Sequence, residues 1–114
     1  MSAKFLISKT SNGKFRFVLK AANGETILAS QMYAQLASAR NGVESVKRNA
    51  GRVEMYERLT SSRGEPYFTL RAGNGQVVGT SEMYSTTRSR DSGIESVKTN
   101  APRATIDESD LGKA

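Results

Sequence analysis

The chain has 114 residues, enough for one ordinary domain or for two units too small to be stable apart. It contains no cysteine and no histidine, which excludes disulfides, the common zinc ligands and nucleophiles activated by histidine. The formal net charge is +6, and the first 50 residues hold eight basic against two acidic residues. The N-terminal apolar run is only three residues long and no stretch has the about 20 apolar residues of a membrane span, so we expect a cytoplasmic protein without membrane insertion.

The first quarter of the chain predicts three strands. Residues 3–9 form the first, with Phe5 and Ile7 on one face. Residues 14–21 alternate between apolar and charged side chains, which is typical of a strand with one face toward water. Asn23-Gly24 predicts a type I′ hairpin leading to a third strand over residues 25–30. The faces of that third strand stay open, because Ile27 and Leu28 are adjacent.

A helix is expected next, from Leu36 to Ala50, with one apolar stripe. Gly42 lies inside it and costs roughly 1 kcal/mol relative to alanine. We therefore expect a steric reason for this glycine, namely a close approach of helix and sheet. Gly51 is expected to end the helix in a left-handed conformation.

The stretch from Lys20 to Ala50 returns without a gap from Arg71 to Ala101, 51 residues later. We divide the chain into repeat 1 (residues 1–51), repeat 2 (residues 52–107) and a flexible tail (residues 108–114). A unit of about fifty residues buries only roughly 60% of its unfolded surface, so the two repeats are expected to share one core within a single structural domain.

Repeat 2 predicts the same elements with informative changes. Residues 52–59 predict a strand that both closes repeat 1 and opens repeat 2. Pro66 indicates a strand start or a sheet edge, because proline cannot donate to a ladder. Ser85 is expected to cap the second helix, and Pro102 to follow its end. A short strand is expected at Thr105-Ile106.

Few residues qualify for chemistry. Glu44 and Glu95 recur on the two helices, either as a symmetric acidic pair or as solvated residues near a lysine. The repeated S-x-M-Y, which ends in Tyr33 and Tyr84, either lines a small site or packs the helix onto the sheet. We favour the structural interpretation of both motifs, and expect no catalytic residues, no cofactor and no metal.

The basic first repeat suggests an acidic partner, nucleic acid among the candidates, although a solubilising surface explains the same charges. An open sheet face with cations and an aromatic resembles in outline a platform for single-stranded nucleic acid. The candidate polyanion-binding residues are Lys14, Arg16, Lys20, Arg40, Lys47, Arg48, Tyr67 and Arg71. The alternative is a structural or stress-associated protein that binds another protein along a sheet edge.

The repeated signature, K-F-R-F-V-L-K-A-A-N-G-E with S-x-M-Y and N-G-V-E-S-V-K-R-N-A, resembles the small bacterial YegP-like family. The resemblance covers about residues 4–101 and implies an α+β fold. Two tandem βββα(β) repeats would form one continuous antiparallel sheet with both helices on one face and the C-terminal strands exchanged between repeats. Family members with a single unit are expected to dimerise, so we expect this duplicated chain to be a monomer. The resemblance brings no catalytic residue, cofactor or partner. Ala34 and Pro66 depart from the pattern.

Overall fold

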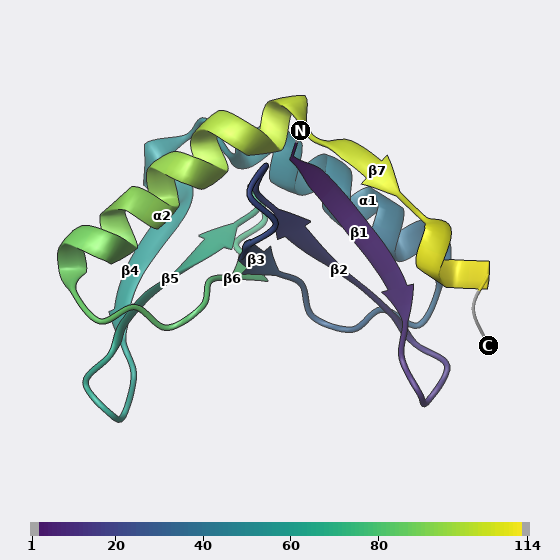
Figure 1. Ribbon diagram of the computed structural model, residues 1–114, viewed down its shortest axis with the longest axis horizontal. Coiled ribbons are helices and arrows are strands. Elements are labelled where there is room, and N and C mark those ends of the chain that lie inside the picture. The colour runs from purple at the N-terminus through teal and green to yellow at the C-terminus, as the bar shows by residue number, and fades with distance from the viewer. Residues whose placement is uncertain (1–2, 113–114) are drawn as a thin grey trace.

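The computed structural model describes residues 3–112 and shows a seven-stranded sheet with two helices (Figure 1). The strands are β1 (Lys4–Lys9), β2 (Phe15–Lys20), β3 (Thr26–Ala29), β4 (Tyr56–Thr60), β5 (Pro66–Arg71), β6 (Val77–Thr80) and β7 (Thr105–Asp107). The helices are α1 (Leu36–Asn49) and α2 (Thr87–Asn100), with short 3₁₀ segments η1 (Val53–Met55), η2 (Ala101–Arg103) and η3 (Ser109–Gly112).

The strand order is β4-β5-β6-β3-β2-β1-β7, and the two repeats meet where Ala29 of β3 pairs with Thr80 of β6. The α+β class, the tandem repeat and the exchange of the last strand are confirmed, because β7 follows repeat 2 but pairs with β1 of repeat 1. One detail differs from expectation: β7 runs parallel to β1, so the sheet is mixed. Helix α2 carries the chain across the sheet before β7, and such a crossover permits a parallel entry.

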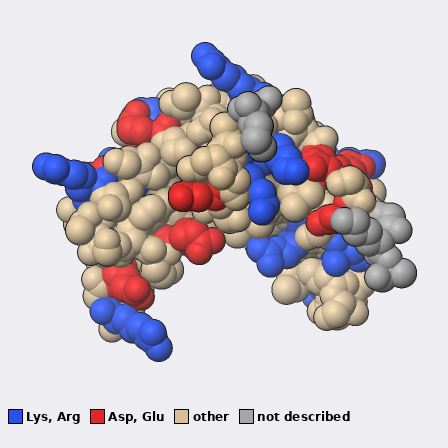
Figure 2. Space-filling model, in the orientation of Figure 1, with Lys and Arg blue, Asp and Glu red and all other residues tan. Residues whose placement is uncertain are grey.

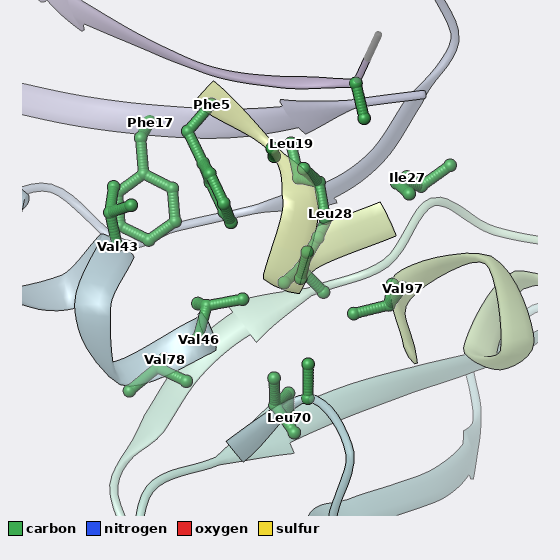
Figure 3. Packing of buried hydrophobic residues seen from close by; sticks show 14 of the residues in the cluster. Phe5, Phe17, Leu19, Ile27, Leu28, Val43, Val46, Leu70, Val78 and Val97 are labelled. Carbon is green, nitrogen blue, oxygen red and sulfur yellow. The ribbon is translucent and has the colours of Figure 1, made fainter. Parts of the chain in front are cut away.

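Both helices lie along one side of an arch-shaped sheet, and the β1–β2 and β4–β5 hairpins form its two feet (Figure 1). Each helix packs on the central strand of the other repeat, α1 on β6 and α2 on β3. The close view shows this crossing, with Val46 of α1 near Val78 and Val97 of α2 near Ile27 (Figure 3). One core therefore serves both repeats, as their small size predicts.

A β-bulge settles the faces of β3. The register between β2 and β3 shifts between Leu19 and Lys20, so that Ile27 is an extra residue. Ile27 and Leu28 consequently both reach the core, with exposed fractions of 7% and 0%. The same shift recurs between β5 and β6.

The Asn23-Gly24 hairpin exists, but its predicted turn type is wrong. Only Gly24 has a positive φ, +88°, and no non-glycine residue within 3–112 has one. The Ala21 N–H donates to the Glu25 carbonyl at 2.9 Å, closing a three-residue loop in which the last residue is left-handed. This loop needs one glycine where a type I′ turn would need two positive φ angles.

Three boundary predictions were also wrong. The side chain that caps α2 belongs to Thr86, which accepts the Ser89 N–H at 3.0 Å, and Ser85 lies one residue earlier. Gly51 is not among the residues with positive φ. The strand predicted over residues 52–59 begins only at Tyr56, because η1 occupies Val53–Met55. Pro66, by contrast, is the first residue of β5, as expected.

The predicted short strand is confirmed as β7, and residues 108–112 of the predicted tail make contacts with the rest of the fold. Glu108 bonds Arg40 of α1, and residues 109–112 form η3. Leu111 packs against the core beside β1. Residues 113–114 of the predicted tail lie outside the described residues.

Candidate polyanion-binding surface

The eight predicted polyanion-binding residues lie on two sides of the molecule. Phe17 and Leu19 of β2 are fully buried under the helices. Because strand side chains alternate, Arg16 and Lys20 face the opposite side, which we call the open face. Five of the eight belong to the open face or its hairpin, and the other three to α1: Lys14, Arg16, Lys20, Tyr67 and Arg71 in the first group, and Arg40, Lys47 and Arg48 in the second.

Lys14, Arg16 and Lys20 form a row along β2, which we call the β2 row. At about 3.3 Å per residue the row is about 20 Å long. None of the three makes an ion pair within residues 3–112. Lys4 lies opposite Lys20 on β1, but its ammonium is bound by Asp107 at 2.9 Å. The β2 row is therefore a line of cations that the described part of the chain does not neutralise.

The equivalent row on β5 is balanced. Arg71, the counterpart of Lys20, bonds Glu57 at 2.9 Å and the Gly75 carbonyl at 2.5 Å. Glu65 and Tyr67 stand where repeat 1 has Lys14 and Arg16. Tyr67 is three strand spacings from β2, about 14 Å, so it belongs to a separate part of the open face.

The three α1 residues differ among themselves. Arg40 holds Glu108 through two hydrogen bonds of 2.7 Å, and this contact keeps the pKa of Glu108 below its usual range. Lys47 and Arg48 lie in the last turn of α1, where cations also stabilise the helix C-terminus. In Figure 2, blue and red side chains are interspersed over the face in view, so the positive charge there does not form one unbroken patch.

The S-x-M-Y motif is structural in both repeats. The Ser30 hydroxyl accepts the Phe17 N–H at 2.9 Å, and Ser81 does the same for Phe68. Tyr33 stacks on Phe17 with ring centroids 6.3 Å apart. Burial raises the pKa of the Tyr33 phenol, and a hydrogen bond with the Gln31 side chain offsets part of this rise. The methionines of the motif are exposed, which differs from the packing role their recurrence suggested.

The steric reason expected for Gly42 is confirmed. A β-carbon there would lie 2.5 Å from the Tyr33 hydroxyl oxygen and 2.9 Å from Phe17. Gly93 has the same relationship to Tyr84 and Phe68. The recurrent glycine therefore lets the helix approach the tyrosine that ends the motif.

The recurrent glutamates are on different helices, and each is exposed. Glu95 bonds Lys98 at 3.3 Å, which is the solvated arrangement expected from their spacing. It also lines an open depression on α2 with Asp91 and Arg88. Within residues 3–112, no three acidic side chains gather as metal ligands. No helix of this range has the length and hydrophobicity of a membrane span.

Sequence reasoning missed a groove between α1 and the β5–β6 hairpin. Its two connected parts have volumes of about 450 and 240 Å³ and share Ser45, Ala72 and Asn74. Arg48 and Arg52 line one end, and amide and hydroxyl side chains line the other. The groove joins residues from both repeats, so only the packing of α1 on the second repeat reveals it.

Comparison with known proteins gives a consistent result. The model of a domain of unknown function, DUF1508, matches residues 10–57 and again residues 61–108. A UPF0339 protein of Acinetobacter baylyi is 51% identical over 106 residues, which cover 93% of this chain and 96% of the relative. The YegP protein of Escherichia coli is 49% identical over the same coverage.

Two solved structures share the fold. The solution NMR structure of YegP from Escherichia coli, a protein of unknown function, has a TM-score of 0.93 at 46% identity. It covers 100% of this chain and 97% of its own. A UPF0339 protein from Shewanella oneidensis has a TM-score of 0.89 at 46% identity, covering 95% of this chain and 92% of its own. The chain therefore belongs to the YegP-like UPF0339 family, whose domain of unknown function it carries twice.

Proposed function

We propose that the protein is a non-enzymatic binding module whose partner is a polyanion, with single-stranded nucleic acid as the first candidate. The observation that carries the proposal is the β2 row of Lys14, Arg16 and Lys20. These cations make no ion pair within residues 3–112, whereas Arg71 on the equivalent strand is bound by Glu57. An unneutralised row of this kind binds phosphates with release of counterions.

The proposed site contains only three of the eight polyanion-binding residues predicted from the sequence. Arg40 is engaged by Glu108, and Lys47 and Arg48 lie in the helical layer, so neither group joins the row on one surface. Tyr67 remains a candidate for stacking a base farther along the open face. We propose that a monomer is the binding form, because the second repeat supplies the neighbour that a single unit would recruit by dimerising.

The test is fluorescence anisotropy with a labelled single-stranded oligonucleotide across a salt series. One variant replaces the β2 row: Lys14→Ser, Arg16→Ser and Lys20→Ser. The control removes the same charge from exposed positions of repeat 2: Arg63→Ser, Arg88→Ser and Arg103→Ser. Loss of three phosphate contacts lowers the slope of log K against log salt by about 2 in the first variant only. An equal loss in both variants, or no binding at low salt, refutes the proposal.

The alternative of a protein partner bound along a sheet edge has less support. One edge strand of the sheet is β7, which has only three residues, and a very short edge strand offers little for strand addition. At the other edge, Arg58 of β4 projects toward the helical side and bonds Asp91 of α2 at 3.0 Å. A charged side chain that faces inward on an edge strand is a recognised obstacle to strand addition.

A further inference from the structure

The groove between α1 and the β5–β6 hairpin differs in charge from its counterpart in the other half of the molecule. An offset of 51 residues relates the two repeats, so every groove residue has a known equivalent between α2 and the β2–β3 hairpin. The frame is the same in both: the tyrosine that ends S-x-M-Y, the helix glycine it touches, and an asparagine in the hairpin. For the groove these are Tyr33, Gly42 and Asn74.

Seven of the groove positions differ between the two surfaces, and the three that alter charge all do so in one direction. Gln31 and Gln76 of the groove become Glu82 and Glu25, and Arg48 becomes Thr99. Each of these three changes removes positive charge from, or adds negative charge to, the surface between α2 and the β2–β3 hairpin. Glu82 and Glu25 both lie close enough to Tyr84 to help burial raise the pKa of its phenol.

The arginine end of the groove suits an anion. Arg48 and Arg52 line this part, which has a volume of about 450 Å³. Arg48 makes no ion pair within residues 3–112, and the Arg52 contact with Glu54 is long and exposed, at 3.5 Å. Two carbonyls at the end of α1 are already occupied, because Ala50 accepts the Tyr56 hydroxyl at 2.6 Å and Asn49 accepts the Arg52 N–H. Guanidinium groups bind phosphate through paired hydrogen bonds.

The other end of the groove is neutral and polar, with an apolar floor. Its hydrogen-bonding side chains come from α1, from the segment after β3 and from the hairpin: Gln31, Ser38, Asn41, Ser45, Asn74 and Gln76. Val78 and Tyr33 supply apolar surface there. Amides and hydroxyls above an apolar floor recognise a body that has several hydroxyls and C–H faces.

We propose that this groove binds a small phosphorylated polyol, such as a sugar phosphate, with the phosphate between Arg48 and Arg52 and the hydroxyls on the amide side chains. The site does not depend on the β2 row, which lies on the open face. The equivalent surface between α2 and the β2–β3 hairpin is a matched control, because it keeps the same frame and differs in charge.

The test is NMR titration of the full chain with glucose 6-phosphate, glucose and inorganic phosphate as probes. We expect saturable shifts of the Ser45, Asn74 and Gln76 amides with glucose 6-phosphate, and weaker binding of the other two probes. The variant Gln31→Glu, Arg48→Thr, Gln76→Glu gives this groove the charges of the equivalent surface between α2 and the β2–β3 hairpin, and should lose at least about tenfold in affinity. All three positions are exposed, so the fold is expected to persist.

Two further variants separate the outcomes. Arg88→Ser removes a charge from α2 and should leave the affinity unchanged. Glu25→Gln, Glu82→Gln, Thr99→Arg should create glucose 6-phosphate shifts around Asn23, on the surface between α2 and the β2–β3 hairpin. The proposal is overturned if no shift saturates by about 10 mM, if inorganic phosphate binds as tightly, or if the groove variant binds like the parent. A β2-row variant that loses oligonucleotide but keeps glucose 6-phosphate refutes neither proposal and shows that the two sites are separate, which supports this one.

Discussion

Leu28 fills the space above Gly79, its own equivalent in the second repeat. A β-carbon on Gly79 would lie 2.5 Å from both Cγ and Cδ2 of Leu28. The two residues meet because β3 and β6 are neighbours at the centre of the sheet. Leucine at both positions would overfill this centre, so the duplicated strand needed one large and one small residue.

The first prediction follows from this contact. Gly79→Ala should lower the free energy of unfolding by about 1–3 kcal/mol, because the crowded atom of Leu28 is a branch point and cannot simply swing away. Exchanging the pair, Leu28→Gly with Gly79→Leu, should recover much of the stability that Gly79→Leu alone loses. Urea denaturation measures both. If the losses in unfolding free energy caused by Leu28→Gly and by Gly79→Leu simply add in the double variant, the two side chains do not compete for the same space.

A second prediction concerns the helix glycine. Alanine at Gly42 gains about 1 kcal/mol of helix propensity but meets the Tyr33 hydroxyl. We expect Gly42→Ala to destabilise, and to do so less when Tyr33→Phe removes the hydroxyl. Gly51→Ala is the control, because nothing lies within 4 Å of a β-carbon at that position. Thermal denaturation measures these effects. A higher melting temperature for Gly42→Ala than for the parent would show that the Tyr33 side chain can move aside at little cost.

The sequence predicts much of this fold because its apolar pattern and its duplication are local signals. Phe17 and Leu19 alternate as a half-buried strand must, and Gly42 and Gly93 recur for a steric reason. The type of the Asn23-Gly24 turn was predicted wrongly, because the same two residues also fit a three-residue loop in which only the glycine needs a positive φ. The direction of β7 was missed because it depends on where α2 delivers the chain.

The candidate site could be predicted only in part, for a similar reason. Alternation places Arg16 and Lys20 together on the open face. It does not reveal that Arg71 meets Glu57, or that Arg40 meets Glu108 from 68 positions away. The groove beside α1 depends on contacts between the repeats, which no local pattern encodes.

Tyr56 gives a prediction with a pH dependence. Its buried hydroxyl donates to the Ala50 carbonyl, so Tyr56→Phe should lower the free energy of unfolding by about 1–2 kcal/mol at neutral pH. Burial, helped by Glu95, raises the pKa of this phenol above its ordinary 10.0. The folded state thus favours the protonated phenol, and that contribution is lost as the pH rises above about 10. Denaturation between pH 8 and 11 should show a smaller alkaline loss for Tyr56→Phe than for the parent.

The attachment of β7 to β1 should weaken at acid pH. Hydrogen bonds from Ser109, and then Lys4, hold the pKa of Asp107 below its ordinary 3.8, and Arg40 holds that of Glu108 below 4.5. Both groups therefore stabilise the fold above these ordinary values, and the contribution disappears as the pH falls through the lower folded-state values. Heteronuclear NOEs of β7 amides should stay constant from pH 6 to about 4.5 and fall progressively toward about pH 2, with β5 amides as the internal reference. Asp107→Asn should reproduce part of the loss at pH 6, and unchanged β7 NOEs in that variant would contradict the ion pair's role.

The exposed edge of β4 provides the last prediction. Arg58 is the equivalent of Ile7, which is fully buried on β1. Repeat 1 can bury an isoleucine there because β7 and η3 cover that edge, whereas within residues 3–112 nothing pairs with the outer edge of β4. Arg58→Ile should therefore expose an apolar edge strand and leave Asp91 with Arg90 alone, so the protein should self-associate. Sedimentation velocity at increasing concentration measures this, with Arg63→Ile in the nearby turn as the control. Identical sedimentation of both variants would show that Arg58 does not protect the edge.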